Sequence, residues 1–588
     1  MSKQKQYDQK KSTGSHYTPP KLAEFVARRI LHHFDVDHQH SIRILDPACG
    51  SGELLEAFFR LASSSVRDRL VLVGVDNDAS SVSRAEARLR ELHAGPVRVV
   101  RADFLDIGLK NCGQTDFFND APDLDPFHAV IANPPYVRTQ VMGAKKSQQL
   151  SAAFNLNGRI DLYQAFLVAM TQELCTGGIL GAIVSNRFLS TKSGASTRKF
   201  LATHYNIQEL YDLGDTKLFD AAILPAVFIG AKRESDEDKV KLGEFVRIYQ
   251  SEYQPKNCAH TDSVFSILAQ RRSGVYESQG QSYTVSSGVL NIPSDPSDLW
   301  QLVDPTEKLW LETIDRNSFC RIGDLVSVRV GIKTTADKVF IRSNWNVLEE
   351  DFRPEPELLH RLLTPDDAQK WRPDLDHEKA KYVLYTHLVE DEKRRAISLS
   401  EYPKAAAYLE NNRERLEGRN YVIEAGRNWY EIWVPQDPSA WSKPKLAWPD
   451  IKGEPQFFYD DSGSIVKGNC YWITLDNEQG QDLLLLILGI ANSNLMTRYH
   501  DLVFNNKLYS GRRRYLTQYV EKYPLPDSNS EASQRITALV RSLVFEEPEE
   551  AEIGRIELEL EKAVSSVFGV KPVLKERNRL EVESVVCH

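Results

Sequence analysis

An asparagine and a tyrosine flank two consecutive prolines directly after a short apolar run, in the stretch HAVIANPPYVR. The prolines rule out regular structure, so Asn133, Pro134, Pro135 and Tyr136 form a rigid segment at the end of a strand. The Asn133 side-chain oxygen and the Pro134 carbonyl can each accept one hydrogen of a planar amine, and Tyr136 offers a face for stacking. Fixed acceptors of this kind favour a nitrogen that becomes tetrahedral as its lone pair attacks. The tetrapeptide therefore predicts a clamp for a planar amine.

A strand, a glycine-rich turn and a helix are expected in ILDPACGSGELL, residues 44–55. Glycines let a backbone approach a ligand closely, and a helix N-terminus offers free N–H groups. A lone Gly-x-Gly also occurs in ordinary strand–helix turns, so by itself it is weak evidence. Cys49 lies inside the turn, which favours a lining role over that of a covalent nucleophile. The residues predicted to line a cofactor here are Asp46, Pro47, Ala48, Cys49, Gly50 and Gly52, and Asn133 and Pro135 of the tetrapeptide are predicted to contact the cofactor as well.

Acidic residues also end the next two predicted strands, Asp76 before Asn77 and Asp103 before Phe104. A carboxylate at the end of the second strand can accept hydrogen bonds from ribose hydroxyls, and Asn77 adjoins it. Asp103 can take an adenine amino group while Phe104 flanks the ring. Three acid-tipped strands in this order resemble the S-adenosylmethionine (SAM) site of class I methyltransferases.

Short β-branched runs alternate with helical stretches over the first ~235 residues, as in IRILD (42–46) and LYQAFLVAMTQEL (162–174). Such alternation builds a parallel sheet covered by helices on both faces. With the resemblance above, we expect an α/β, Rossmann-like class I SAM-dependent methyltransferase domain at 1–240. A second α+β domain is expected at 245–527, where aromatic and turn residues become frequent. A C-terminal helical extension at 528–588 includes one amphipathic stretch.

Composition narrows the class of protein. The 588-residue chain is too long for one core, and it is 41% hydrophobic and 26% charged, as in globular proteins. No apolar run reaches the roughly 18 residues of a membrane helix, and the N-terminus lacks a signal core. The seven cysteines are scattered without a CxxC or Cys/His cluster, so neither a metal site nor a disulfide framework is expected. The net charge of −9 leaves nucleic-acid binding open, because binding requires only a local basic surface.

The order of these motifs resembles the gamma-class N6-adenine DNA methyltransferases of type II restriction-modification systems, the TaqI-like family. The match begins with a YTPP element, which the resemblance places near the methionine end of SAM through Tyr17, Thr18 and Pro19. It continues through DPACGSG and NPPY to the C-terminal part, and the resemblance implies that the α+β domain at 245–527 is a DNA target-recognition domain. In the later motif DLGDTKLFDAAIL, Phe219 matches a second aromatic residue that contacts the target adenine.

This resemblance implies methyl transfer from SAM to adenine N6 in double-stranded DNA. A base inside a duplex cannot reach the pocket, so the adenine must be flipped out. The resemblance also implies pairing with a separately encoded restriction endonuclease, and a cytoplasmic, nucleoid-associated place in a bacterial or archaeal cell.

Two segments of the C-terminal half are predicted to face DNA. One has basic residues interleaved with tyrosines, and the other is the loop VGIKTTADKVFI at 330–341. Arginine can read guanine or bind phosphate, and most such residues bind phosphate. The residues concerned are Lys507, Tyr509, Arg512, Arg513, Arg514 and Tyr515 in the first segment and Lys333, Thr334 and Thr335 in the second.

Other readings remain open. NPPY also occurs in methyltransferases that act on RNA bases, on protein glutamine or on cytosine N4. The glutamine enzymes lack a large recognition domain, and the cytosine-N4 enzymes more often have serine in place of Asn133. A bifunctional restriction-modification enzyme would need a nuclease, yet the YTPP element begins within about 20 residues of the start. A silent DNA-binding subunit would not need an intact tetrapeptide.

Overall fold

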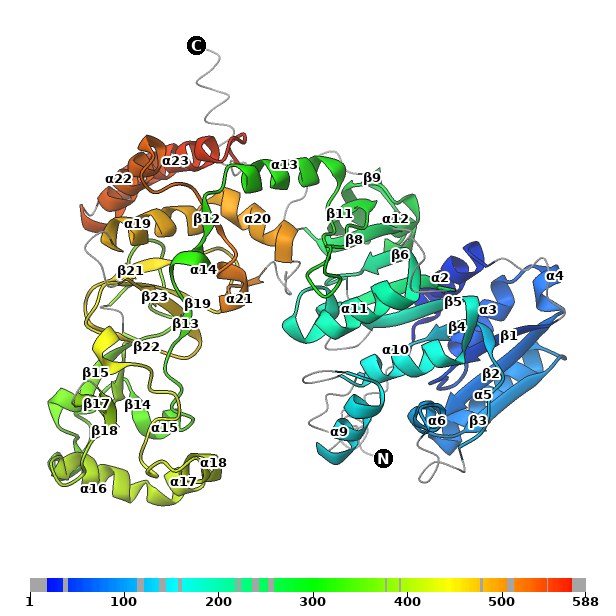
Figure 1. Ribbon diagram of the computed structural model, residues 1–588, viewed down its shortest axis with the longest axis horizontal. Coiled ribbons are helices and arrows are strands. Elements are labelled where there is room, and N and C mark those ends of the chain that lie inside the picture. The colour runs from blue at the N-terminus through cyan, green and yellow to red at the C-terminus, as the bar shows by residue number, and fades with distance from the viewer. Residues whose placement is uncertain are drawn as a thin grey trace, which may run out of the picture. The chain divides into compact units, whose positions relative to one another are not determined.

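The computed structural model forms two compact units, residues 1–307 with 502–511 and residues 308–501 with 512–588. Figure 1 gives the element labels used below. The structure describes residues 18–34, 41–113, 121–136, 144–156, 161–216, 218, 224–234, 243–251, 259–375, 378–390, 393–475, 480–504, 512–546 and 548–573.

One large sheet organises the first unit. Eleven strands of the described residues run in the order β3-β2-β1-β4-β5-β7-β6-β8-β11-β10-β9. Neighbours from β3 to β5 are parallel, whereas β7 is antiparallel to both β5 and β6. The strands are β1 (Ile42–Asp46), β2 (Leu70–Asp76), β3 (Val97–Arg101), β4 (Phe127–Ala132), β5 (Leu174–Ser185), β6 (Tyr205–Asp212), β7 (Pro225–Lys232), β8 (Glu244–Gln250), β9 (Ala259–His260), β10 (Gly274–Ser278) and β11 (Gln281–Val289).

Helices cover both faces of this sheet, as the alternating sequence pattern predicts. One face carries α2, α3 and α5, and the other carries α6, α10 and α11. The helices of this unit are α2 (Pro20–His32), α3 (Glu53–Leu61), α4 (Ser64–Arg67), α5 (Ala79–Leu92), α6 (Phe104–Asn111), α9 (Ala144–Ala153), α10 (Leu162–Glu173), α11 (Ala195–His204) and α12 (Val264–Gln270), with 3-10 turns at Asn186–Leu189 and Lys192–Gly194. The predicted α/β, Rossmann-like methyltransferase fold is confirmed.

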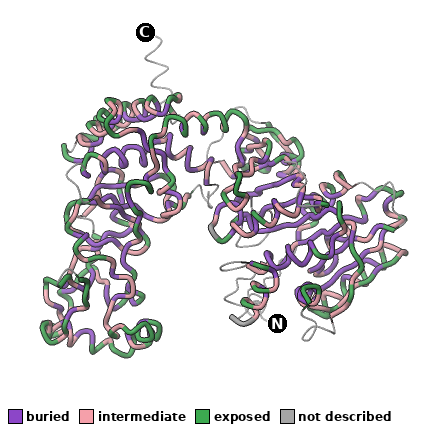
Figure 2. Tube along the Cα trace, viewed as in Figure 1, coloured by how far each residue is buried: buried purple, intermediate pink, exposed green. Residues whose placement is uncertain are grey.

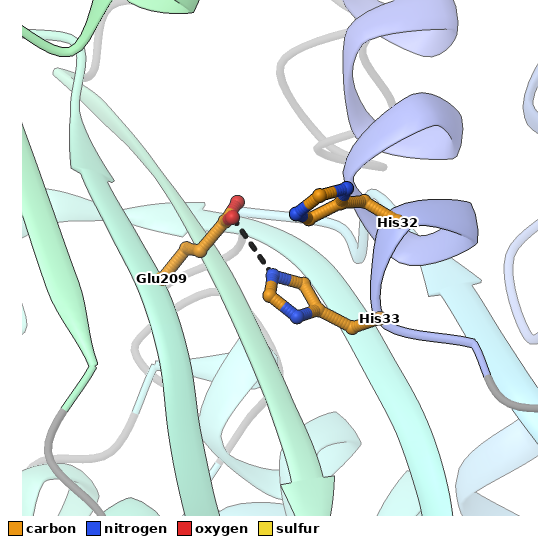
Figure 3. Close-up of side chains that lie close together, drawn as sticks. All are labelled: His32, His33 and Glu209. Carbon is orange, nitrogen blue, oxygen red and sulfur yellow. Dashed lines mark hydrogen bonds and ion pairs between the residues drawn. The ribbon is translucent and has the colours of Figure 1, made fainter.

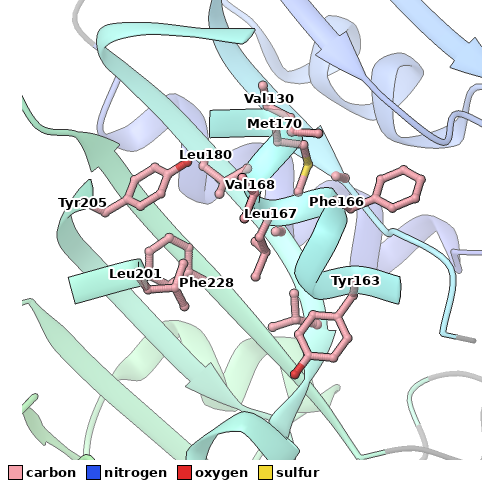
Figure 4. Close-up of a cluster of buried hydrophobic side chains, with 14 of the residues drawn as sticks. Val130, Tyr163, Phe166, Leu167, Val168, Met170, Leu180, Leu201, Tyr205 and Phe228 are labelled. Carbon is pink, nitrogen blue, oxygen red and sulfur yellow. The ribbon is translucent and has the colours of Figure 1, made fainter. Parts of the chain in front are cut away.

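Alternate residues of the strands enter two separate cores. Leu45 and Val130 lie in the cluster under α6 and α10, whereas Ile44 and Ile131 lie in the cluster under α2 and α3. This follows from the period of two in a strand. Buried residues are concentrated along the strands in Figure 2. In Figure 4 the apolar side chains of α10 pack against β4 and β5.

The first unit extends further along the chain than the sequence placed it. The predicted first domain ends at 240, but β8 pairs with β6 in parallel, and β11 pairs with β8. These hydrogen bonds join residues 244–289 to the large sheet, and the compact unit ends at Glu307. Helix α13 (Pro305–Arg316) crosses that boundary.

The second unit combines small sheets with helices. Among its described residues, two four-stranded sheets have the orders β13-β23-β19-β21 and β14-β16-β15-β22. Its strands are β12 (Cys320–Arg321), β13 (Arg329–Val330), β14 (Ile341–Arg342), β15 (Leu359–Leu363), β16 (Lys381–Leu384), β17 (His387–Glu390), β18 (Lys393–Ala396), β19 (Lys445–Pro449), β20 (Ile451–Lys452), β21 (Phe458–Asp460), β22 (Ile465–Val466), β23 (Cys470–Thr474), β24 (Arg513–Arg514) and β25 (Pro524–Leu525). Aromatic residues pack among aliphatic ones in its core, and the ring centroids of Trp441 and Trp472 lie 4.8 Å apart.

The described part of the C-terminal extension packs into this second unit, where α22 contacts both α19 and α23. The Trp371 indole donates to Glu557 on α23 over 2.8 Å, which fastens the last helix to the unit. The helices are α14 (Ile322–Leu325), α15 (Asp337–Phe340), α16 (Pro403–Asn411), α17 (Arg413–Glu417), α18 (Asn420–Glu424), α19 (Gly480–Ala491), α20 (Asn494–Phe504), α21 (Thr517–Val520), α22 (Glu531–Phe545) and α23 (Glu550–Val567), with 3-10 turns at Glu350–Phe352, Pro356–Leu358 and Pro438–Ala440. Within the described residues, no helix has the length and apolar character needed to cross a membrane.

Candidate active site

The glycine-rich turn after β1 is held close to β2. The Cys49 N–H donates to the Val75 carbonyl over 2.9 Å, and Gly50 and Gly52 have φ of +52° and +87°, where side chains are strained. A Cβ at Gly50 would meet no atom within 4 Å. In contrast, a Cβ at Gly74 on β2 would lie 2.9 Å from the Cys49 sulfur, so that glycine makes room for the turn. The backbone at Gly50 therefore faces open space, as a ligand-cradling turn requires.

The acids that end β1 and β2 bind the backbone of this turn. Asp76 accepts the Gly50 N–H over 2.9 Å and the Asp78 N–H over 2.8 Å, and Asp46 accepts the Ala48 N–H over 3.1 Å. Each carboxylate oxygen has two lone pairs, so both acids keep acceptor capacity beyond these bonds. Of the residues beside these acids, Pro47 is buried, Ala48 is half-buried and Asn77 is exposed to solvent.

Negative charge accumulates at this end of the sheet. Burial raises the pKa of the Asp46 carboxyl well above its usual range, and the Asp76 and Glu53 carboxylates add to the rise. A cation placed beside Asp46 would relieve this penalty, because it favours the ionised carboxylate. Burial also raises the pKa of the Cys49 thiol, so the thiol is not activated as a nucleophile. This agrees with a lining role for Cys49.

Asp103 lies between two roles. It caps α6 by accepting the Leu105 N–H over 3.0 Å, and its second oxygen pairs with Lys146 on α9 at 2.6 Å. The sequence predicts that Phe104 flanks the adenine ring. In the structure Phe104 is only 2% exposed and stacks on Phe166 with ring centroids 5.7 Å apart, so its ring belongs to the core.

The tetrapeptide after β4 is anchored through its asparagine. The Asn133 carboxamide nitrogen donates to the Thr18 hydroxyl over 2.9 Å, while its oxygen accepts from the Tyr136 hydroxyl over 2.8 Å. Thr18 is buried just before α2, where Pro19 is the N-terminal cap residue. The two bonds fix which way the carboxamide points. Thr18 therefore touches the tetrapeptide itself, beyond its predicted place near the cofactor.

Tyr136 folds back toward β5. Its hydroxyl lies 2.8 Å from Asn133 Oδ1 and 3.1 Å from the Ile183 carbonyl oxygen, and burial raises its pKa. The residue as a whole is half-buried, as are Asn133 and Pro135, whereas Pro134 is buried. The hydroxyl is thus tied to the frame of the site.

Strand order brings these residues to one edge. β1 lies between β2 and β4, and β3 flanks β2, all parallel. Their carboxyl ends meet at the edge where open α/β sheets bind ligands. The structure thereby gathers Asp46, Asp76, Asp103 and Asn133, as the sequence predicts. Tyr17, Phe219, Lys507 and Tyr509 lie outside the described residues.

The predicted DNA-facing residues of the second unit behave differently. Arg513 donates to both oxygens of Asp501, over 2.6 and 2.8 Å, and also bonds the Gly453 carbonyl. Thr334 is 1% exposed and bonds Asp337. In contrast, four residues are open to solvent or partly so, namely Lys333, Thr335, Arg512 and Arg514, while Tyr515 is buried.

A separate polar cluster lies where α2 packs beside β6. The side chains of His32, His33 and Glu209 lie close together (Figure 3), and their ligand atoms are all within 4.8 Å of one another. Glu209 also binds Arg29 and Arg271, and although burial opposes it, bonds from His33 and Arg29 lower its pKa. Two guanidinium groups would repel a metal ion there. The cluster is therefore a structural ion network, one not foreseen from the sequence.

Two further contacts were missed by sequence reasoning. The Thr18–Asn133 bond joins positions 115 residues apart, and the Lys146–Asp103 pair joins positions 43 apart. Neither a spacing nor a local motif marks such pairs, because tertiary packing creates them.

Comparison with known proteins follows the same division of the chain. A family model described as Eco57I restriction-modification methylase matches residues 101–219, and one described as TaqI-like C-terminal specificity domain matches residues 393–525. A solved structure that resembles the chain is a putative class I S-adenosylmethionine-dependent methyltransferase from Listeria monocytogenes. It is 21% identical with a TM-score of 0.32, over 39% of this chain and 65% of that one.

Relatives match nearly the whole chain. The type II methyltransferase M.BstVI of Geobacillus stearothermophilus is 24% identical over 91% of this chain and 94% of its own length. The type II methyltransferase M.BanIII of Aneurinibacillus aneurinilyticus is 44% identical over 95% of this chain and 98% of its own length. Together with the two matching family models, this identity shows that the chain belongs to the type II restriction-modification DNA methyltransferases.

Proposed function

We propose that this DNA methyltransferase transfers a methyl group from SAM to the N6 amine of adenine in a specific duplex site. The observation that carries the proposal is the Asn133 carboxamide, held between Thr18 and Tyr136 at the sheet edge that also gathers three carboxylates.

The cofactor is supported by the chemistry of the residues at this edge. SAM carries an ammonium and a sulfonium, and the buried Asp46, crowded by Asp76, is a place where a cation is favoured. The Gly50 backbone faces open space, and Asp76 keeps acceptor capacity for ribose hydroxyls. When bound, SAM supplies an electrophilic methyl group.

The amine is activated by acceptors on the protein. The adenine N6 lone pair is delocalised into the ring, which makes the amine a poor nucleophile. The Asn133 oxygen and the Pro134 carbonyl accept its two hydrogens and so favour a tetrahedral nitrogen, with its lone pair directed at the methyl group. Because Thr18 and Tyr136 already orient the carboxamide, little reorganisation is needed in the transition state.

The substrate base reaches this pocket by flipping out of the duplex, because the amine is inaccessible in stacked DNA. Tyr136 supplies a stacking face, and Phe219 is proposed as the second aromatic contact. The exposed basic residues of the second unit hold the DNA backbone. A separately encoded restriction endonuclease, from which methylation protects the site, is the proposed functional partner.

The test is methylation sequencing of plasmid DNA from a methylation-deficient host that expresses the chain, with Asn133→Ala as the matched inactive control. N6-methyladenine at one short motif, absent with the control, is the expected result. Methylation of cytosine N4 at that motif would overturn the choice of base. Unmodified DNA from a chain that still binds SAM would overturn the DNA-adenine assignment in favour of RNA.

A further inference from the structure

Lys146 brings a positively charged group to the predicted cofactor site. Its ammonium lies 2.6 Å from Asp103 Oδ2, whereas Asp103 Oδ1 accepts the Leu105 N–H and caps α6. The lysine therefore meets the oxygen that is not committed to the helix cap. About two fifths of the Lys146 side chain is exposed.

Helix α9, which carries Lys146, is fixed by packing at its other end. Leu150 is fully buried and Phe154 is 6% exposed, both in the core under α6 and α10. Phe154 directly follows α9, and a Cβ at Gly108 of α6 would lie 3.1 Å from its ring, so this end of the helix is held close to α6. The packing of Leu150 and Phe154 therefore positions Lys146 beside Asp103.

The pair offers an acceptor and a donor side by side. A carboxylate oxygen only accepts, and an ammonium has three N–H groups, of which one points at Asp103. The Watson–Crick edge of adenine carries the complementary pattern, with an amino donor next to the N1 acceptor. Hypoxanthine reverses that pattern, because it has a carbonyl oxygen next to a protonated N1.

We propose that Asp103 and Lys146 together read the adenine edge of the cofactor, Asp103 Oδ2 accepting from the amino group and Lys146 donating to N1. The inference rests on the proposed function, since it presumes a SAM site at Asp103. It makes Lys146 a cofactor-binding and specificity-determining residue. The alternative is a purely structural role, in which the ion pair only holds α9 against α6.

The experiment measures dissociation constants of the purified full chain by calorimetry, with S-adenosylhomocysteine and its hypoxanthine analogue S-inosylhomocysteine as probes. Wild type is expected to bind the adenine ligand at least about tenfold more tightly than the analogue. Lys146→Met should weaken adenine-ligand binding about tenfold, a loss of about 1.4 kcal/mol, and shrink the discrimination. Lys146→Arg, which keeps a donor, should restore most of both.

Lys145→Met removes the same charge one position earlier and is the matched control, expected to behave as wild type. Thermal melting of each variant checks that the fold is kept. Unchanged or tighter binding of the adenine ligand by Lys146→Met would overturn the inference, as would equal losses for both ligands, which indicate a purely structural role. Wild type that binds neither SAM nor S-adenosylhomocysteine would instead overturn the proposed function itself.

Discussion

The two units place their polar residues by different rules. In the first, Asp46, Asp76, Asp103 and Asn133 follow parallel strands, so a single sheet edge collects them. In the second, the basic residues lie on loops and very short strands, and Arg513 is paired with Asp501. Strand topology therefore makes the position of a residue at a strand end predictable, whereas the role of a loop arginine depends on which acid the fold places beside it.

The largest expected effect comes from replacing Asn133 in the first unit. Asn133→Ala should lower the single-turnover methylation rate by about 10²–10³-fold or more, because one preorganised acceptor is lost from the transition state. SAM affinity should change little, since the carboxylates are untouched. Transfer of a labelled methyl group to cognate DNA measures the rate. A variant that loses SAM binding along with activity would show that Asn133 acts on the cofactor and not on the amine.

In the second unit, two adjacent arginines are expected to have different roles, one in stability and one in DNA binding. Arg513→Ala should lower the free energy of unfolding by about 1.5–3 kcal/mol, because it removes two charge-assisted hydrogen bonds to the partly buried Asp501. Arg512 is exposed, so Arg512→Ala should leave stability unchanged and reduce the salt slope of DNA binding by about one. Denaturant titration and DNA binding at several salt concentrations give the two readouts. The opposite assignment of effects would mean that Arg513 leaves Asp501 to bind DNA.

The sequence was informative where periodicity and chain order decide structure. β1 spans the predicted residues 42–46, α10 covers the predicted helix, and the amphipathic stretch near the C-terminus forms α23. β6 was not foreseen, although it is central to the sheet between β7 and β8. Its sequence YNIQELYD contains polar residues, so it lacks the continuous apolar run of a buried strand. The structure accommodates Glu209 there by pairing it with charged residues.

For the candidate site, the sequence indicated which polar residues stand at strand ends but not which contacts they make. Acids and NPPY at strand ends identified the edge, but the aromatic next to Asp103 turned inward. Phe104 begins α6, and its ring packs on Phe166 of α10. Lys146 could not be inferred, because its meeting with Asp103 depends on how α9 packs. Long-range pairs of this kind leave no local pattern in a single sequence.

The pH dependence of SAM affinity would test the electrostatic role of Asp46 in the first unit. The pKa of Asp46 is raised by burial, so the carboxyl is protonated over a wider acidic range than usual. Cationic SAM favours the ionised form, so its affinity should fall as pH drops below that raised pKa. The contribution of Asp46 to folding stability changes in the opposite direction. Because its pKa is higher in the folded protein than in the unfolded chain, raising the pH lowers the free energy of unfolding. Asp46→Asn should bind SAM about tenfold more weakly and lose this pH dependence in calorimetry, whereas a wild-type affinity that is flat with pH would contradict the role.

The smallest effect is expected from separating the Tyr136 hydroxyl from its ring. Tyr136→Phe removes the hydroxyl, whose one proton is donated to Asn133 Oδ1 or to the Ile183 carbonyl, but keeps the stacking face. The rate should fall only about fivefold, in line with about 1 kcal/mol for one neutral hydrogen bond. Tyr136→Ala should cost more, because base stacking is worth about 1–3 kcal/mol. Single-turnover rates, together with fluorescence of 2-aminopurine at the target position, separate orientation of Asn133 from capture of the base. Equal losses in the two variants would assign Tyr136 to holding the carboxamide, and the stacking partner would then have to be sought elsewhere.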